Sequence, residues 1–117
     1  MMRLHNEKGD ISVSTSVFTN IAGAAAMNCF GVKGMAVRSM TDGLVHLLRK
    51  EAMSKGVRVT FQDDGSIIID LHIIIDQGVN ITTLGSSIIN EVRYVVEKST
   101  GTEVREVNVF VDSVMAG

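Results

Sequence analysis

The sequence predicts an α+β fold, a two-layer sandwich in which helices pack on one face of a small mixed β-sheet. Residues 66–76, SIIIDLHIIID, contain six isoleucines and alternate as a strand does. Further alternating, valine-rich segments lie on both sides of this stretch, and other segments carry apolar residues at helical spacing. We therefore expect residues 66–76 to be the strand around which the sheet is built.

The predicted strand has two faces of different character. With a period of two, its odd-numbered residues form a continuous apolar face. The even-numbered face mixes apolar, charged and imidazole side chains: Ser66, Ile68, Asp70, His72, Ile74 and Asp76. We expect the odd face in the core and the even face outside it.

Length and composition predict one domain in a reducing compartment. A chain of 117 residues can bury roughly two thirds of its unfolded surface, so we expect a single domain over residues 1–117, with residues 1–9 as a loose polar tail. Cys29 is the one cysteine and cannot form an internal disulfide. The sequence has no secretory signal and no apolar run of about 20 residues, which favours a cytoplasmic protein without a membrane span. The net charge of −2, with no long block of basic residues, argues against nucleic-acid binding.

The first helix is predicted between a short strand and a glycine. Residues 10–13 are expected to form an edge strand, and Ser14 or Thr15 can cap the helix that follows by accepting a hydrogen bond from a free amide. Gly31 suits the left-handed conformation at a helix end. The helix is predicted because residues that can share one face recur at helical spacing: Val17, Ile21, Ala24, Ala25 and Asn28.

A second strand and a second helix are expected next. Residues 35–38 favour a strand. From Thr41 or Asp42 to Gly56, leucine and alanine recur at helical spacing opposite charged residues, which predicts an amphipathic helix.

Residues 57–61 are predicted to form a hairpin with the central strand through a three-residue loop at 63–65. This loop length places Phe61 opposite Ile67 and brings the apolar faces of both strands to one side. A two-residue loop would shift the register by one place and turn one apolar face outward.

A long helix and a final strand complete the predicted fold. The helix is expected from Asn80 or Thr82 to about Gly101, and the strand from about residue 104 to 114. The predicted apolar stripe of the helix comprises Leu84, Ile88, Val92, Val95 and Val96. The mixed face of the strand is predicted to comprise Glu106, Asn108, Phe110 and Asp112.

The candidate chemical site is the grouping of Asp70, His72 and Asp76 on one strand face, which could orient an imidazole or bind a metal. The hairpin register also offers Asp70 a cross-strand ion pair with Arg58, which favours a structural explanation. No nucleophile motif, phosphate loop or dinucleotide fingerprint is present. The residues therefore predict no enzyme, no cofactor and no metal.

Large apolar residues on the mixed faces predict an interaction surface instead. Ile68, Ile74 and Phe110 lie on faces expected outside the core, where an apolar patch marks an interface. We expect self-association or partner docking there. The predicted interaction face comprises Arg58, Ile68, Asp70, His72, Ile74, Asp76 and Phe110.

Several longer segments carry a family resemblance. They include GVKGM after the first helix, GVNI after the central strand, and STGTEVREVNVFV, in which a helix stops at glycine before a valine-rich strand. With these segments nearly the whole chain resembles the alkaline-shock-protein family of Gram-positive bacteria, also called the envelope stress response family, and TDGLVHLLRKEAMSKGV resembles its short members.

The resemblance implies a cytoplasmic protein connected with cell-envelope homeostasis and stress, with no enzymatic motif. It also implies a protein partner that can be membrane-anchored and would hold the chain at the membrane periphery. The leading hypothesis is a non-enzymatic scaffolding protein that acts through protein–protein interaction. The alternatives are a nucleic-acid-binding or regulatory module and a small-molecule-binding domain.

Overall fold

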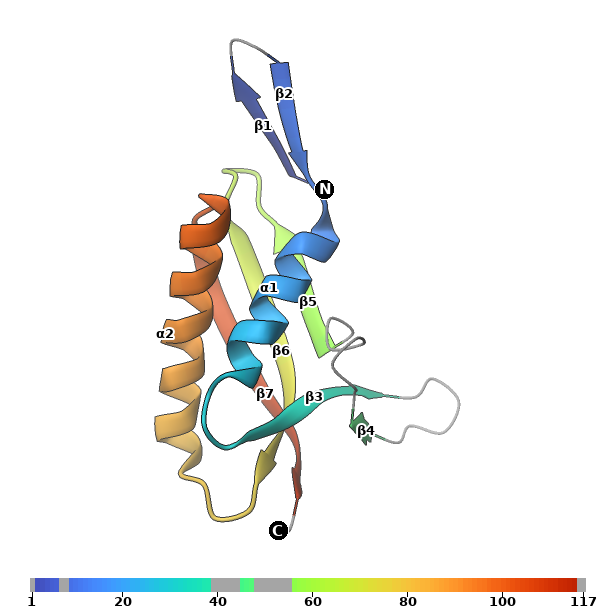
Figure 1. Ribbon diagram of the computed structural model, residues 1–117, viewed down its shortest axis with the longest axis vertical. Coiled ribbons are helices and arrows are strands. Elements are labelled where there is room, and N and C mark those ends of the chain that lie inside the picture. Colours follow the sequence, from blue (N-terminus) through green and yellow to red (C-terminus); the bar gives the residue numbers. More distant parts are fainter. Residues whose placement is uncertain (1, 7–8, 39–44, 48–55, 116–117) are drawn as a thin grey trace.

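The central strand β6 (Ile67–Asp76) is paired along both of its edges (Figure 1). The computed structural model describes residues 2–6, 9–38, 45–47 and 56–115. In it, β7 (Val104–Met115) runs parallel to β6 along the whole of one edge. The antiparallel strands β5 (Val57–Phe61) and β3 (Val32–Arg38) therefore share the other edge. The sheet is mixed, as predicted.

Two helices, α1 (Thr15–Met27) and α2 (Ile81–Thr100), cover one side of this sheet (Figure 1). The odd-numbered residues of β6 are at most 1% exposed and belong to one apolar cluster with both helices. From the helices and β6, the largest fully buried members are Phe18, Ile67, Ile69, Leu71, Ile73, Ile75, Ile88, Val92 and Val96. The α+β sandwich and the buried odd face are confirmed.

The β5–β6 hairpin has the predicted register. Phe61 lies opposite Ile67, and the Gln62 N–H donates to the Ser66 carbonyl at 2.8 Å, which leaves three residues in the loop. The Asp64 carboxylate accepts from the Ser66 amide at 2.9 Å and from its hydroxyl at 2.6 Å. These two hydrogen bonds, the hydroxyl's first, lower the pKa of Asp64.

The α2 helix also follows its prediction. The Asn80 side chain caps its start by accepting from the Thr83 amide at 3.0 Å. Gly101 ends it in the left-handed conformation, with φ of 72°, and its N–H donates to the Glu97 carbonyl. The buried residues Leu84, Ile88, Val92 and Val96 all come from the predicted apolar stripe.

The prediction for the buried face of α1 is only partly right: Ala25 is buried and Ile21 packs against the core, but the other predicted members do neither. Val17 is 41% exposed and Ala24 is exposed, whereas the buried residues are Phe18, Thr19, Ala22, Gly23, Ala25 and Ala26. Both faces have helical spacing because the helix is apolar almost all round, so periodicity cannot choose between them. The large ring of Phe18 decides, since it packs edge-on against Phe61 at 5.7 Å between ring centroids. Ser14 is the capping residue, but its hydroxyl bonds to that of Ser16 and makes no capping hydrogen bond.

The structure has short strands in two segments where the sequence predicted a loose tail and a helix. The polar tail predicted at residues 1–9 contains β1 (Met2–Asn6), which pairs antiparallel with β2 (Gly9–Val13) in a separate hairpin. The strand predicted at residues 10–13 is confirmed as part of β2, but the apolar alternation of its partner β1 is too short to identify a strand, and β1 was therefore not predicted. Within the helix predicted up to Gly56, β4 (Val45–Leu47) pairs with β3. Most of the rest of that predicted helix lies outside the described residues.

A seam lies between β5 and β3 on their shared edge of β6. The β5 strand ends its pairing at Leu71 and β3 begins at Ile73, which leaves His72 between them. At this seam Gly56 is buried so close to β3 that an added Cβ would lie 2.9 Å from the Ala36 carbonyl oxygen. Glycine is the residue that lets the two strands meet there.

Candidate functional site

The candidate site is the outer face, which we define as the sheet surface opposite the helices that carries the even-numbered side chains of β6. Neither helix packs on it, since both belong to the cluster on the odd face. Its predicted members were Arg58, Ile68, Asp70, His72, Ile74, Asp76 and Phe110. Their contacts differ from one residue to the next.

His72 is held by two residues of β7. Its Nδ1 lies 3.1 Å from Oδ1 and 3.2 Å from Oδ2 of Asp112, and its ring stacks on Phe110 at 4.8 Å between centroids and 15° between planes. The Asp112 side chain is 8% exposed, the His72 side chain 42%. Because a carboxylate only accepts, Nδ1 carries the proton and donates it. The imidazole is therefore fixed in orientation while one side of it stays open to solvent.

A β-bulge brings Asp112 to this position. The parallel register pairs Ile73 with Val111 but Ile74 with Ser113, so Asp112 is an extra residue in β7. A bulge bends its strand locally and redirects the side chain of the extra residue. The backbone irregularity thus supplies the hydrogen-bond partner of His72.

Asp70 has a different partner from the one expected. Arg58 lies opposite it in the β5 register, as predicted, but Asp70 Oδ1 accepts instead from Asn108 Nδ2 at 2.9 Å. The predicted Arg58–Asp70 ion pair is therefore wrong, and Arg58 is exposed. The short Asn108 side chain, directly beside Asp70 in β7, loses less rotamer entropy on bonding than the long arginine chain would.

Asp76 lies at the far end of β6 and pairs with a residue of β3. Its Oδ1 is 3.2 Å from Lys33 Nζ, with both side chains more than a third exposed. A pair as exposed as this contributes little to stability. Asp70, His72 and Asp76 thus each bond to a different residue, and the structure does not bring them together as one site.

The predicted apolar patch is also divided. Ile74 is only 3% exposed, Ile68 is half-buried, and Phe110 is 45% exposed. The expectation of three exposed apolar residues is therefore wrong for Ile74. The exposed centre of the outer face is the stacked pair of His72 and Phe110.

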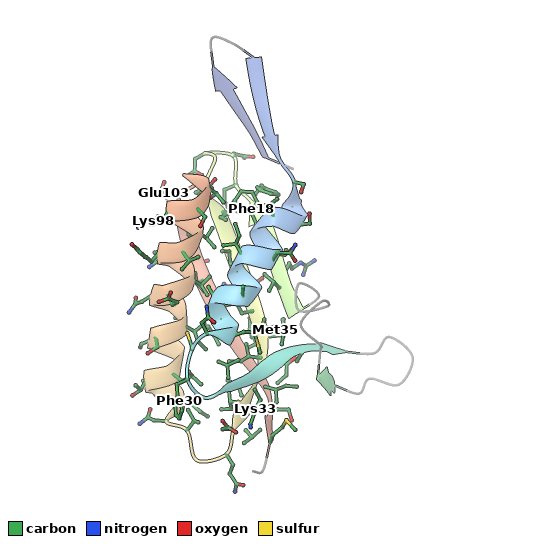
Figure 2. The ribbon with its side chains drawn as sticks, in the orientation of Figure 1. Phe18, Phe30, Lys33, Met35, Lys98 and Glu103 are labelled. Carbon is green, nitrogen blue, oxygen red and sulfur yellow. The ribbon has the colours of Figure 1, made fainter. Side chains whose placement is uncertain are left out.

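A pocket of about 890 Å³ lies elsewhere, where α1 ends and α2 begins. Cys29, Val79 and Leu84 contribute apolar surface to its lining, and Phe30 beside them is 95% exposed (Figure 2). Burial, followed by the nearby Glu91 carboxylate, raises the pKa of the Cys29 thiol, so this thiol is a poor nucleophile. Sequence reasoning missed this pocket because its lining comes from two stretches far apart in the chain, residues 28–30 and 76–91.

The described residues show no assembled metal site. No three side chains of the types His, Cys, Asp and Glu lie together in that part of the chain as metal binding would need. Neither α1 nor α2 is long and apolar enough to cross a bilayer.

Three residues of the site were not identified as partners from the sequence. Asn108 and Asp112 were placed on the mixed face of the last strand by alternation, but nothing tied them to Asp70 and His72. Parallel pairing of β7 with β6 would have supplied the first link, since it puts Asn108 beside Asp70. No sequence signal marks the bulge at Asp112 or the Lys33–Asp76 pair.

Comparison with known proteins places the chain in a family. Residues 3–116 match the alkaline shock protein 23 family, which has a cell envelope-related function. The chain is 37% identical over 114 residues to the "uncharacterized protein YloU" of Bacillus subtilis strain 168, a match that covers 97% of this chain and 94% of that protein. It is 33% identical to the "uncharacterized protein Spy1614" of Streptococcus pyogenes serotype M6, over 97% of this chain and 93% of the relative. No solved structure matches the chain significantly. The chain therefore belongs to the alkaline shock protein 23 family.

Proposed function

We propose that this protein is a non-enzymatic scaffold of the cell envelope that binds another protein through the outer face of its sheet. The family's cell envelope-related function supports the setting. The observation that carries the binding surface is the His72–Phe110 stack, an aromatic pair left open to solvent on a face that neither helix covers.

The stack is suited to be the anchor of an interface. Aromatic residues that are fixed in place bind with a small loss of conformational entropy and are common in binding hot spots. The Asp112 carboxylate fixes the imidazole, and Phe110 is fixed by the stack. Around this centre lie the exposed Arg58 cation and the half-buried Asp70 carboxylate. A partner with an apolar or aromatic residue at its centre and charges of both signs at its rim would fit this surface.

The contacts of His72 support a structural role for it over a catalytic one. Among the described residues, its hydrogen-bond and ring contacts are with Asp112 and Phe110, and none of them is with a serine, threonine or cysteine that an imidazole could activate. We propose that the protein works in the cytoplasm and reaches the membrane through a partner that is itself membrane-anchored, as the family resemblance implies.

The test is a crosslinking pull-down from the native cell, comparing Phe110→Ala with Phe30→Ala. Both residues are exposed phenylalanines, but Phe30 lies at the end of α1, away from the outer face. We expect Phe110→Ala to lose its crosslinked partners and Phe30→Ala to keep them. Equal capture by both variants would contradict the proposal. A gel shift at low salt that disappears in Arg58→Ala would favour the nucleic-acid alternative.

A further inference from the structure

One edge of β7 is not paired with any described strand (Figure 1). The strand is 12 residues long and contains no proline. A long edge strand is a template for pairing with another strand, and proteins usually protect such edges. The hydrogen bonds at the two ends of β7 determine which of its backbone N–H and C=O groups point to this edge.

The C-terminal end of β7 fixes which residues face β6. Successive residues of a strand direct their N–H and C=O to alternate edges. The Gln77 N–H donates to the Met115 carbonyl at 3.0 Å, so Met115 faces β6. Every second residue before Met115 also faces β6, except that the extra residue Asp112 shifts the alternation by one place. The backbone groups of Phe110 and Asn108 therefore face β6 as well.

The hydrogen bonds at the N-terminal end of β7 lead to the same assignment of the residues that face β6. The Ile67 N–H donates to the Glu103 carbonyl at 3.0 Å, and β7 has an extra residue at Arg105. Counting forward from Glu103 again places Asn108 toward β6. The backbone groups that point to the free edge between the bulges therefore belong to Val107, Val109 and Val111.

Side chains of α2 cover the start of this edge. Glu97 Oε2 accepts from the Val104 amide at 2.8 Å, and Arg93 Nη2 donates to the Arg105 carbonyl at 3.5 Å. For the outward groups of Val107 to Val111, the described part of the chain supplies no hydrogen-bond partner. The free part of the edge thus begins where the α2 side chains stop and lies between the two bulges.

We propose that this edge pairs antiparallel with the same edge of a second copy of the chain, with Val109 on the two-fold axis. Val109 would then exchange hydrogen bonds with its own counterpart, and Val107 with Val111 of the second copy. The free groups are spaced symmetrically about Val109, which is what pairing with itself requires. Residues 107–111 carry no charge. At each end of this stretch Glu106 would lie opposite Asp112 of the second copy, whose carboxylate is 8% exposed and bonded to His72. On the outer face, Asn108 would lie opposite the exposed ring of Phe110 of the second copy.

Phe110 borders both surfaces, but this interface depends on the backbone groups of Val107, Val109 and Val111, whereas the proposed function depends on the side chains of His72 and Phe110. Val109→Pro therefore tests the first and Phe110→Ala the second, so either can be wrong without the other. Because a contact of a few residue pairs is small for an interface, the dimer should be weak, and we expect it to form at micromolar protein concentrations. The primary measurement is sedimentation of the full chain over about 1–200 μM. A concentration-dependent shift from monomer to dimer supports the proposal, and a monomer throughout this range overturns it.

Neighbouring substitutions separate the free edge from the β6 ladder. Val109→Pro removes an outward N–H, and it is expected to raise the dimer dissociation constant at least about tenfold while β6 stays paired. Val109→Ala loses the side chain but keeps that N–H, so it should dimerise within about threefold of the unmodified chain. Asn108→Pro removes an N–H that faces β6 and should instead lower the melting temperature. A folded Val109→Pro that dimerises as well as Val109→Ala would overturn the proposal.

Hydrogen exchange gives a readout that needs no variant. On going from dilute to concentrated protein, the amides of Val107, Val109 and Val111 should gain protection while those of Asn108 and Phe110, already bonded to β6, change little. Equal exchange of the three valine amides at both concentrations would overturn the proposal. Loss of dimer without loss of crosslinked partners, or the reverse, shows which of the two surfaces fails.

Discussion

Replacing Gly56 by alanine is expected to destabilise the sheet at the seam where β5 and β3 meet. An added Cβ would lie 2.9 Å from the Ala36 carbonyl oxygen and 2.9 Å from the Met35 Cβ. Ordinary contacts of a Cβ with heavy atoms lie at about 3.4–4 Å, so one strand must move. Neither neighbour can rotate away, because one is backbone and the other is the first carbon of a buried side chain.

The size of the effect follows from overpacking. Forcing one extra methyl group into a tightly packed site costs about 1–3 kcal/mol. For a chain of this length, that corresponds to a fall in melting temperature of roughly 5–15 °C. Urea unfolding followed by circular dichroism, together with a thermal scan, would measure both quantities.

A matched control is Gly85→Ala in α2. An added Cβ there has no heavy atom within 4 Å outside its own helix, and alanine favours a helix interior over glycine. This variant should gain about 0.5–1 kcal/mol. If Gly56→Ala proves as stable as the unmodified chain, the account of the seam as a close backbone approach is refuted.

Three further predictions concern hydrogen bonds and a helix end. Ser66→Ala removes the hydroxyl that donates to Asp64 and should raise the pKa of Asp64 toward its ordinary range. An NMR titration would follow this change. An unchanged pKa would show that the hydroxyl hydrogen bond is unimportant. Folding lowers the pKa of Asp64, so the ionised carboxylate stabilises the folded loop at pH values above the pKa of Asp64 in the unfolded chain. This stabilisation is lost as the pH falls through the pKa of Asp64 in the folded protein. The pH dependence of stability should therefore be weaker in Ser66→Ala. His72→Ala leaves the buried Asp112 carboxylate without its hydrogen-bond donor and should lower the free energy of unfolding in urea by about 1–3 kcal/mol. The same substitution should cost less in a chain that already carries Asp112→Ala. Additive losses in the double variant would argue against the contact. Gly101→Ala should lower the free energy of unfolding by about 1 kcal/mol, because Gly101 has a positive φ that alanine adopts with strain even though the space around it is open. An unchanged free energy of unfolding would contradict the left-handed helix end.

The elements with a single strong periodicity were predicted from the sequence. The β5–β6 register followed from matching two alternating patterns across a loop of known length, and the α2 helix from one stripe and a glycine stop. The α1 face was predicted only in part, because apolar residues occur on more than one side of the helix and the tertiary contact of Phe18 with Phe61 determines which side is buried. The single-domain assignment for residues 1–117 stays a prediction.

The candidate site was predicted less well, for a physical reason. Alternation tells which side chains share a face, and it correctly put His72, Asn108 and Asp112 on one. Which of them bond depends on the register between β6 and β7, which are separated by all of α2, and on a bulge of one residue. Neither is encoded in local periodicity, so Asp70 was assigned to Arg58 when its partner is Asn108.

The seam between β5 and β3 divides one flank of β6 into two separately paired segments. The β3 strand protects Ile73 to Ile75 and carries β4, while β5 is tied to Ile67 to Leu71 by a tight hairpin. Local unfolding follows contiguous units, so we expect β3 and β4 to open together, exposing Met35, while the hairpin and the helices stay folded. Slow conformational exchange in this protein is therefore expected to concentrate around His72, the residue on which the outer face is centred.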